Sequence, residues 1–109
     1  MGKHLILDCS GAKKLKFNDV YEILDALPAE IKMNKLCAPY VMKGAEHNPG
    51  FTGFIVIEQS HISIHTFTKS DLISIDVYSC KDFNEKIVLT YLKNKKIKII
   101  NSQLILRKA

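Results

Sequence analysis

The sequence predicts an α+β domain in which an antiparallel β-sheet carries two helices packed on one face. Two segments show the helical spacing of apolar residues, and about six segments show β-type patterns. Most of the β-type segments follow one another directly, which favours antiparallel pairing over a doubly wound parallel sheet. The 109 residues suffice for one hydrophobic core, so residues 1–109 are expected to form a single domain.

The N-terminal part is predicted to contain one strand and one helix. Residues 4–8 have a β-type pattern. Asn18 is a suitable N-cap for the following helix, and Pro28 is expected to end it. The apolar stripe that this helix would lay on the sheet recurs every three or four residues and comprises Val20, Ile23, Leu24 and Leu27.

A second strand is predicted over residues 35–42, followed by a loop over residues 43–50. Pro39 lacks the N–H that a β-ladder uses, so this strand is expected at a sheet edge or at a bulge. The loop directly precedes the central β-type segments, and loops in such positions often cover a functional site.

The segment 53–66 is the most unusual part of the sequence. Its two β-type runs flank the polar stretch Glu58-Gln59-Ser60-His61, where a strand that only packed would continue apolar or turn on Gly or Asn. Taken alone, this stretch is explained by a hairpin corner. The alternative is that these polar residues carry chemistry.

The C-terminal part is predicted to add further strands and a second helix. Residues 73–79 alternate apolar and polar side chains, as a half-buried strand does. Asp82 and Glu85 fit a capping box that would open the helix. The apolar face of that helix comprises Val88, Tyr91 and Leu92. Two short strands, 97–100 and 104–106, are expected to finish the chain.

Composition and charge argue against several classes of protein. The longest apolar runs are far shorter than the roughly 20 residues that cross a bilayer, and the start lacks a secretory signal, so a cytoplasmic protein without membrane contact is expected. The formal charge of +5 comes largely from lysines without interleaved aromatic residues, which favours a solvated surface over nucleic-acid binding. Three cysteines without Cys-x-x-Cys spacing indicate reduced thiols rather than disulfides or a zinc site.

One motif and its surroundings resemble a known family. Residues 60–66 read Ser-His-Ile-Ser-Ile-His-Thr, with Thr52–Ile57 before them and Ser74–Cys80 after them. This arrangement resembles the small prokaryotic S-adenosylmethionine decarboxylases, which make their own pyruvoyl cofactor. The opening Gly2–Asp8 is similar as well, so the resemblance covers most of the chain. It implies a homodimer or higher homo-oligomer with sites near the interface, and apolar residues on both faces of several strands fit dimerisation through the sheets.

The resemblance implies self-cleavage between Gln59 and Ser60, giving a β chain of residues 1–59 and an α chain of residues 60–109. A serine hydroxyl held in a strained backbone attacks the preceding carbonyl and converts the amide into an ester. Elimination then frees the first fragment, and loss of ammonia leaves a pyruvoyl group at residue 60. The ketone of that group condenses with the amine of a small amino-acid substrate and accepts electrons as CO₂ leaves.

Three further residues take roles by resemblance. His65 would manage protons during processing, Cys80 would protonate the decarboxylated product, and Thr52 would hold the oxyanion of the cyclised intermediate. Without the resemblance, these residues would be read as a half-buried strand histidine, a small core cysteine and a β-forming threonine.

The spacing of these residues sets two geometric expectations. No metal site is expected, because His61 and His65 would lie about 13 Å apart on a strand. On a straight strand Ser60 and His65 would lie about 16 Å apart and on opposite faces. A bend or bulge is therefore expected near residues 58–61.

The chain departs from the family pattern at three places. Gln59 stands where the family normally has glutamate. After the aromatic Phe67, Thr68-Lys69 stands where relatives that use S-adenosylmethionine have Pro-Glu, and an ammonium cannot replace a carboxylate that accepts hydrogen bonds from ribose hydroxyls. The stretch Glu46-His47-Asn48 occupies the place of the aromatic residue that stacks on adenine.

These departures make L-ornithine or L-arginine the first substrate hypothesis, with putrescine or agmatine as the product. Branches of the family act on these amino acids with the same pyruvoyl chemistry. Glu46 is the first candidate to pair with the distal cation of such a substrate, with Asp71 and Asp76 as alternatives, and Phe67 and Lys69 are expected to line the substrate site. S-adenosylmethionine, whose decarboxylation supplies spermidine synthesis, is the second hypothesis. A non-catalytic homologue that regulates an active partner is the third.

Overall fold

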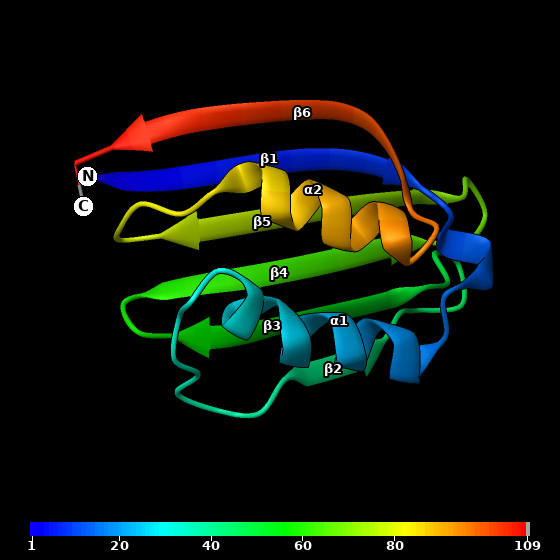
Figure 1. Cartoon of the computed structure of the whole chain (residues 1–109). Coiled ribbons are helices and arrows are strands. Elements are labelled where there is room, and N and C mark those ends of the chain that lie inside the picture. Colours follow the sequence, from blue (N-terminus) through cyan, green and yellow to red (C-terminus); the bar gives the residue numbers. More distant parts are fainter. Residues whose placement is uncertain (109) are drawn as a thin grey trace.

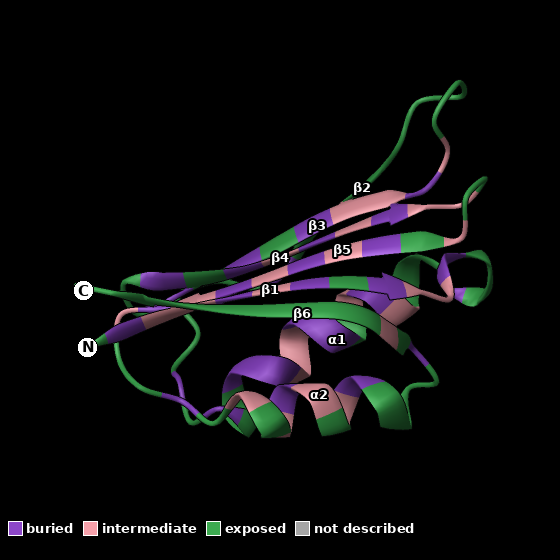
Figure 2. Ribbon diagram, turned by 90° about the horizontal axis from the view of Figure 1, so that it is seen from above, coloured by how far each residue is buried: buried purple, intermediate pink, exposed green. Residues whose placement is uncertain are grey.

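Six antiparallel strands form one sheet, and two helices lie against one of its faces (Figure 1, Figure 2). The structure is a computed structural model that describes residues 1–108. In chain order its elements are β1 (Gly2–Ser10), the 3₁₀ turn η1 (Ala12–Lys14), α1 (Phe17–Glu30), β2 (Tyr40–Lys43), β3 (Phe51–Ile57), β4 (Ser60–Phe67), β5 (Leu72–Ser79), α2 (Glu85–Asn94) and β6 (Lys98–Arg107). The predicted α+β class, with two helices on one face of an antiparallel sheet, is confirmed.

The strand order is β2-β3-β4-β5-β1-β6, so the first strand lies inside the sheet. β1 pairs antiparallel with β5 on one side and with β6 on the other. The last strand returns to the end of the sheet where the chain begins, with Gly2 opposite Arg107 (Figure 1). The strands β2 to β5 follow one another through turns and loops, as the direct succession of β-type segments predicted.

The hydrophobic core lies between the sheet and the helices. The buried apolar side chains of the strands are Leu5, Leu7, Cys9, Ile55, Ile57, Ile62, Ile64, Ile73, Ile75 and Val77, at alternate positions of β1, β3, β4 and β5. The predicted stripe of the first helix is buried against them, and α2 adds Val88 and Leu92. Neither helix covers the opposite face of the sheet, which is called the open face below (Figure 2).

The predicted boundaries of the first helix are wrong at both ends. Lys16, not Asn18, occupies the N-cap, because the Asp19 carboxylate accepts a hydrogen bond from the Lys16 N–H at 2.7 Å. Pro28 lies inside the last turn, and the helix continues to Glu30. Pro28 leaves the Leu24 carbonyl without its helical donor and crowds the preceding turn, but Pro28 and Leu27 are buried, so packing carries the helix past the proline.

Three boundaries in other elements also differ from the predictions. The second strand is shorter, starting at Tyr40 directly after Pro39, although its expected edge position is confirmed. The second helix is capped by Asn84, whose side chain accepts from the Lys86 N–H at 3.0 Å, rather than by Asp82. The two predicted C-terminal strands are one continuous strand, β6, which absorbs an irregularity opposite Asp8 and Cys9.

No helix among residues 1–108 is both long enough and apolar enough to cross a membrane.

The packing predicts that Leu24→Ala destabilises the fold far more than Leu36→Ala. Leu24 is fully buried between α1 and the sheet, whereas the side chain of Leu36 is 63% exposed. We expect a loss of about 2 to 5 kcal/mol in the free energy of unfolding for Leu24→Ala and less than about 0.5 kcal/mol for Leu36→Ala. Urea titrations of both variants at one protein concentration measure the difference, and equal losses would contradict this core.

Candidate active site

The stretch 58–61 contains the turn of the hairpin between β3 and β4. Ile57 pairs with Ser60, so Glu58 and Gln59 form a two-residue turn. The backbone of Glu58 donates to the Asn34 carbonyl at 3.1 Å, and the Asn34 side chain donates to the Glu58 carboxylate at 2.8 Å. The segment after α1 thus holds the turn from one side, and the hairpin-corner interpretation of this stretch is correct as a description of the backbone.

Gln59 adopts a left-handed backbone conformation with φ of 51°. For a residue with a Cβ this conformation costs roughly 1 to 2 kcal/mol, and turns of this kind normally carry Gly or Asn at such a position. The strained residue directly precedes Ser60. Strain of this kind gathers at functional sites, where the surrounding structure maintains it.

Ser60 and Cys80 meet at the end of the sheet where this turn lies. The Ser60 side chain is buried, and its Oγ accepts a hydrogen bond from the Cys80 N–H at 2.8 Å. The Cys80 thiol lies 3.6 Å from the Glu58 carbonyl oxygen, so both Cys80 contacts reach the β3–β4 turn. The contact holds the hydroxyl oxygen in one orientation next to the Gln59–Ser60 peptide bond.

Thr52 and His65 form a second pair on the open face. They lie directly opposite each other in the β3–β4 ladder, and the Thr52 Oγ1 and His65 Nδ1 atoms are 3.0 Å apart. Both side chains are half-buried. The hydrogen bond orients the imidazole ring and leaves Nε2 available to exchange a proton.

The two pairs lie far apart within one chain. The expected bend near residues 58–61 is wrong, because the β3–β4 ladder runs without a shift from Ile57 opposite Ser60 to Thr52 opposite His65. The five steps along β4 span about 16 Å, and strand alternation places Ser60 on the helix-covered face and His65 on the open face. A single chain therefore brings Ser60 together with Cys80, and Thr52 together with His65, but it does not join the two pairs.

The predicted substrate residues lie at the Thr52–His65 end of the sheet. The Lys69 ammonium reaches the His47 carbonyl at 3.4 Å, and the Thr68 N–H donates to the Pro49 carbonyl at 3.0 Å. The loop that carries Glu46 is thus attached to the β4–β5 turn, while the Glu46 side chain is exposed. Phe67 closes β4 opposite Leu72.

Gly50 brings this loop against β4. Its φ is 147°, and a Cβ at this position would lie 1.9 Å from the Thr66 carbonyl oxygen. The neighbouring Phe51 N–H donates to the Thr66 hydroxyl at 2.8 Å. The loop is therefore fixed beside His65, as its place before the central segments suggested.

The alternative acidic residues have other partners. The Asp71 carboxylate accepts from the Lys13 N–H at 2.8 Å, so it is engaged with the segment before α1. Asp76 lies on the open face, 3.6 Å from the Nε2 atom of His4. Neither Asp71 nor Asp76 lies on the loop that carries Glu46.

A polar cluster on the open face was missed by the sequence reasoning. The Tyr78 ring lies 6.2 Å from the His4 ring and 5.5 Å from the His61 ring, and the Arg107 guanidinium lies 4.9 Å from its centre. With Asp76, these residues come from four strands. Alternation could have placed them on one face, but only the strand order makes them neighbours.

Among residues 1–108, no three His, Cys, Asp or Glu side chains are placed to hold one metal ion. His61 and His65 stand four residues apart on the same strand. Burial raises the pKa of the Cys9 thiol to about 11, which keeps that cysteine protonated and unreactive. Cys37 is exposed, and Cys80 is the one cysteine beside Ser60.

Comparison with known proteins shows which family this chain is similar to. A family model described as S-adenosylmethionine decarboxylase matches residues 3–105. An S-adenosylmethionine decarboxylase proenzyme of Clostridium botulinum strain Langeland is 33% identical over 95 residues, covering 84% of this chain and 80% of the relative. The proenzyme of Archaeoglobus fulgidus is 30% identical over 86 residues, covering 75% and 73%. The crystal structure of the adenosylmethionine decarboxylase of Aquifex aeolicus superposes with a TM-score of 0.73 at 26% identity, covering 100% of this chain and 95% of that one.

The Thr52–His65 contact predicts that Thr52→Val changes the tautomer balance of one histidine only. Valine keeps the shape of threonine but removes the hydroxyl that contacts Nδ1. We expect the ring-nitrogen shifts of His65 to change in long-range ¹⁵N–¹H spectra, because the preferred tautomer loses its partner. His61, four residues away on the same face, serves as the internal control, and an unaltered His65 would show that the contact is absent in solution.

Proposed function

Because the chain belongs to the S-adenosylmethionine decarboxylase family, we propose that it is a self-processing, pyruvoyl-dependent decarboxylase acting on S-adenosylmethionine. The observation that carries the proposal is the strained Gln59, followed by a buried Ser60 whose Oγ is held by the Cys80 N–H. The first substrate hypothesis, ornithine or arginine, has no support among the named relatives. The names of these relatives instead favour the second hypothesis, in which S-adenosylmethionine is the substrate.

Processing begins at the Gln59–Ser60 peptide bond. The Ser60 Oγ attacks the Gln59 carbonyl carbon, the C–O bond forms, the C–N bond breaks, and the hydroxyl proton passes to the freed nitrogen. Loss of the Ser60 Cα proton then breaks the Cβ–O bond and leaves Gln59 as a carboxylate. Tautomerisation of residue 60 and addition of one water release ammonia and leave the pyruvoyl ketone.

The residues around Ser60 fit the group that this processing makes. The turn exposes Gln59, and the Cys80 N–H, 2.8 Å from the Ser60 Oγ, is a donor for an oxygen at that position. When formed, the pyruvoyl group supplies an electron-withdrawing ketone that condenses with the substrate amine and takes up the electron pair released as CO₂ leaves. The Cys80 thiol, on the same residue as that donor, is the proposed source of the proton for the decarboxylated carbon.

His65 and Thr52 have the chemistry for the remaining steps of processing. An imidazole that keeps one ring nitrogen free can take the Cα proton of residue 60, and a threonine hydroxyl can donate to the oxyanion formed at the Gln59 carbonyl. Both groups lie about 16 Å along the strand from Ser60 in the same chain. The proposal therefore needs a second chain to supply them.

The open face supports a homodimer that completes the site. Its exposed apolar residues are Tyr40, Met42, Phe54, Val56, Leu72 and Ile105. Tyr40 and Phe54 stack with ring centres 5.7 Å apart, which adds an aromatic pair to the surface that a second sheet would cover. Sheets that pack face to face lie about 10 Å apart, so side chains of one sheet reach the other.

The direction of the two-fold axis decides which residues meet. An axis that lies between the sheets and runs across the strands reverses the strand direction in the partner copy. The Ser60–Cys80 end of one chain then faces the Thr52–His65 end of the other, whose side chains approach the Gln59–Ser60 peptide from the open face while the Ser60 Oγ reaches it from the helix-covered face. This arrangement gives two composite sites per dimer, each made from both chains.

A basic amino acid remains a second candidate substrate because of Lys69. Its ammonium lies at the end of β4, attached to the Glu46 loop, and offers no acceptor for ribose hydroxyls. Leaving such hydroxyls unpaired costs about 1 to 3 kcal/mol each, which erodes specificity for a nucleoside. Glu46 is the exposed carboxylate that this loop offers to the distal cation of a basic amino acid.

Denaturing mass spectrometry tests the processing step. We expect the wild-type chain to yield two fragments, residues 1–59 and 60–109. Ser60→Ala should stay full length, because it lacks the attacking oxygen. A carbonyl reagent should label residue 60 of the second fragment only. A wild-type chain that stays intact would contradict the proposal and favour the non-catalytic homologue.

A mixing experiment tests the shared site. Ser60→Ala and His65→Ala chains should each stay uncut alone, because each homodimer lacks one part of both sites. When the two variants are produced together, one composite site is complete, and the His65→Ala chain alone should be cleaved. Cleavage of His65→Ala by itself, or none in the mixture, would show that the site is not shared between chains.

A substrate panel separates the two candidate substrates. Processed protein is assayed for CO₂ release from S-adenosylmethionine, L-ornithine and L-arginine. If S-adenosylmethionine is the substrate, Lys69→Glu should raise kcat/KM for it about 10-fold to 100-fold, because a ribose acceptor is gained. Lys98→Glu, the same charge change on β6, is the matched control. Turnover of ornithine or arginine alone would overturn the proposed substrate.

A further inference from the structure

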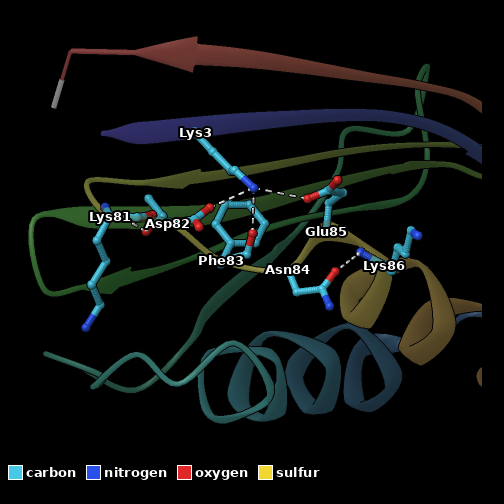
Figure 3. Close-up of polar contacts among 8 residues, drawn as sticks. Lys3, Lys81, Asp82, Phe83, Asn84, Glu85 and Lys86 are labelled. Carbon is cyan, nitrogen blue, oxygen red and sulfur yellow. Dashed lines mark hydrogen bonds and ion pairs between the residues drawn. The ribbon is translucent and has the colours of Figure 1, made fainter.

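Lys3 lies at the centre of a charged cluster that joins the first strand to the loop after Cys80 (Figure 3). Its ammonium contacts the Asp82 carboxylate at 2.7 Å, the Phe83 carbonyl at 2.9 Å and the Glu85 carboxylate at 3.2 Å. An ammonium has three N–H donors, and here each has an acceptor. We call this arrangement the Lys3 clamp.

The clamp begins two residues after Cys80. In the β1–β5 ladder Lys3 lies opposite Ser79, the residue before Cys80. The Ser79 hydroxyl donates to the Lys81 carbonyl at 2.7 Å and is within 3.1 Å of the Lys81 N–H, which closes a tight turn around Cys80. Movement of the loop at Asp82 and Phe83 is therefore transmitted directly to Cys80.

The Lys3 end of the clamp is largely withdrawn from water, whereas the Asp82 side chain is 79% exposed. The Lys3 side chain is 18% exposed, and Phe83, whose ring centre is 5.8 Å from the ammonium, is buried. The hydrogen bond to Asp82 raises the pKa of Lys3, and the hydrogen bond from Lys3 lowers the pKa of Asp82. The clamp is thus fully charged at neutral pH. It weakens only when acid protonates the carboxylates or when strong base deprotonates Lys3.

The opposite end of the same loop is held by Ser60. The Cys80 N–H donates to the Ser60 Oγ, so Cys80 lies between the clamp and the reacting serine. This hydrogen bond of 2.8 Å holds the Ser60 Oγ in place only if the Cys80 N–H that donates it is itself held in place. The clamp supplies that fixed point, because it ties the loop to β1 inside the sheet.

We propose that Lys3 is a positioning residue that holds the Cys80 N–H and thiol in register with Ser60 for self-cleavage and for protonation of the product. The inference rests on the proposed function. Lys3 does not touch the reacting atoms. It acts through the loop, and its loss leaves Ser60, His65 and Cys80 chemically intact while displacing Cys80 from its place.

The test compares Lys3→Met, Lys3→Arg and Lys95→Met. Methionine keeps the length of the alkyl stem and removes all three donors, whereas arginine restores charge and donors. Lys95→Met is the matched control, because the Lys95 ammonium also lies over an aromatic ring, 5.6 Å from the centre of Tyr91, but at the C-terminal end of α2. Cell-free synthesis followed by denaturing electrophoresis gives the self-cleavage rate of each chain.

We expect Lys3→Met to slow self-cleavage about 10-fold to 100-fold, because small displacements of positioned groups cost rates of this size. In processed protein kcat should fall while KM stays within about 2-fold, since the clamp positions a reacting group rather than the substrate. Lys3→Arg should recover most of the rate. Lys95→Met should behave as wild type.

A second readout follows Cys80 itself. In a Cys37→Ser background Cys9 is buried, so maleimide labels mainly Cys80. Maleimide should label Cys80 several-fold faster in Lys3→Met than in the wild-type chain, because the loop that carries Cys80 is released. Wild-type rates of cleavage and labelling in Lys3→Met, or equal losses in Lys95→Met, would overturn the inference.

This readout also keeps the two proposals apart. An uncleaved wild-type chain would overturn the proposed function and, with it, the role of Lys3 in cleavage. Faster labelling of Lys3→Met would then still show that the clamp holds Cys80.

Discussion

The unbroken ladder between β3 and β4 is the constraint on which the chemistry of this chain depends. It forces a two-residue turn, and the turn forces Gln59 into a left-handed conformation directly before Ser60. The same ladder keeps His65 five residues away on the other face of the sheet. One regular feature therefore both strains the bond proposed to break and removes from its own chain the groups proposed to assist. The proposal of a composite dimer rests on this geometry rather than on any single contact.

Alternation and helical spacing were sufficient to predict the fold class, the helix-covered face and most strands. The errors occurred where a local signal competed with a distant partner. Asp82 fits a capping box in the sequence, but its carboxylate pairs with Lys3, so Asn84 caps the helix instead. Pro28 was expected to end a helix that packing against the sheet carries on to Glu30.

The candidate site also shows the difference between what local signals predict and what distant partners decide. Ser60 with Cys80, and Thr52 with His65, are brought together as pairs by strand neighbours, and the resemblance had already selected these residues. The expected bend between the pairs was wrong because it assumed that one chain holds the whole site. The cluster of His4, Asp76 and Tyr78 could not be foreseen, since β1 enters the sheet between strands that come much later in the chain. Lys3 was missed for the same reason.

The place of β1 in the sheet also determines what a cut at residue 59 does to the molecule. The first piece would carry β1, β2 and β3, and the second would carry β4, β5 and β6. Because β1 lies between β5 and β6, and β3 lies beside β4, the two pieces are interlocked along three seams. Severing the backbone would leave every strand where it was. Once unfolded, however, the two pieces would have to meet by diffusion before the sheet could reassemble. Cleavage would therefore turn a chain that folds by itself into a two-piece assembly that refolds far less readily than the uncut chain.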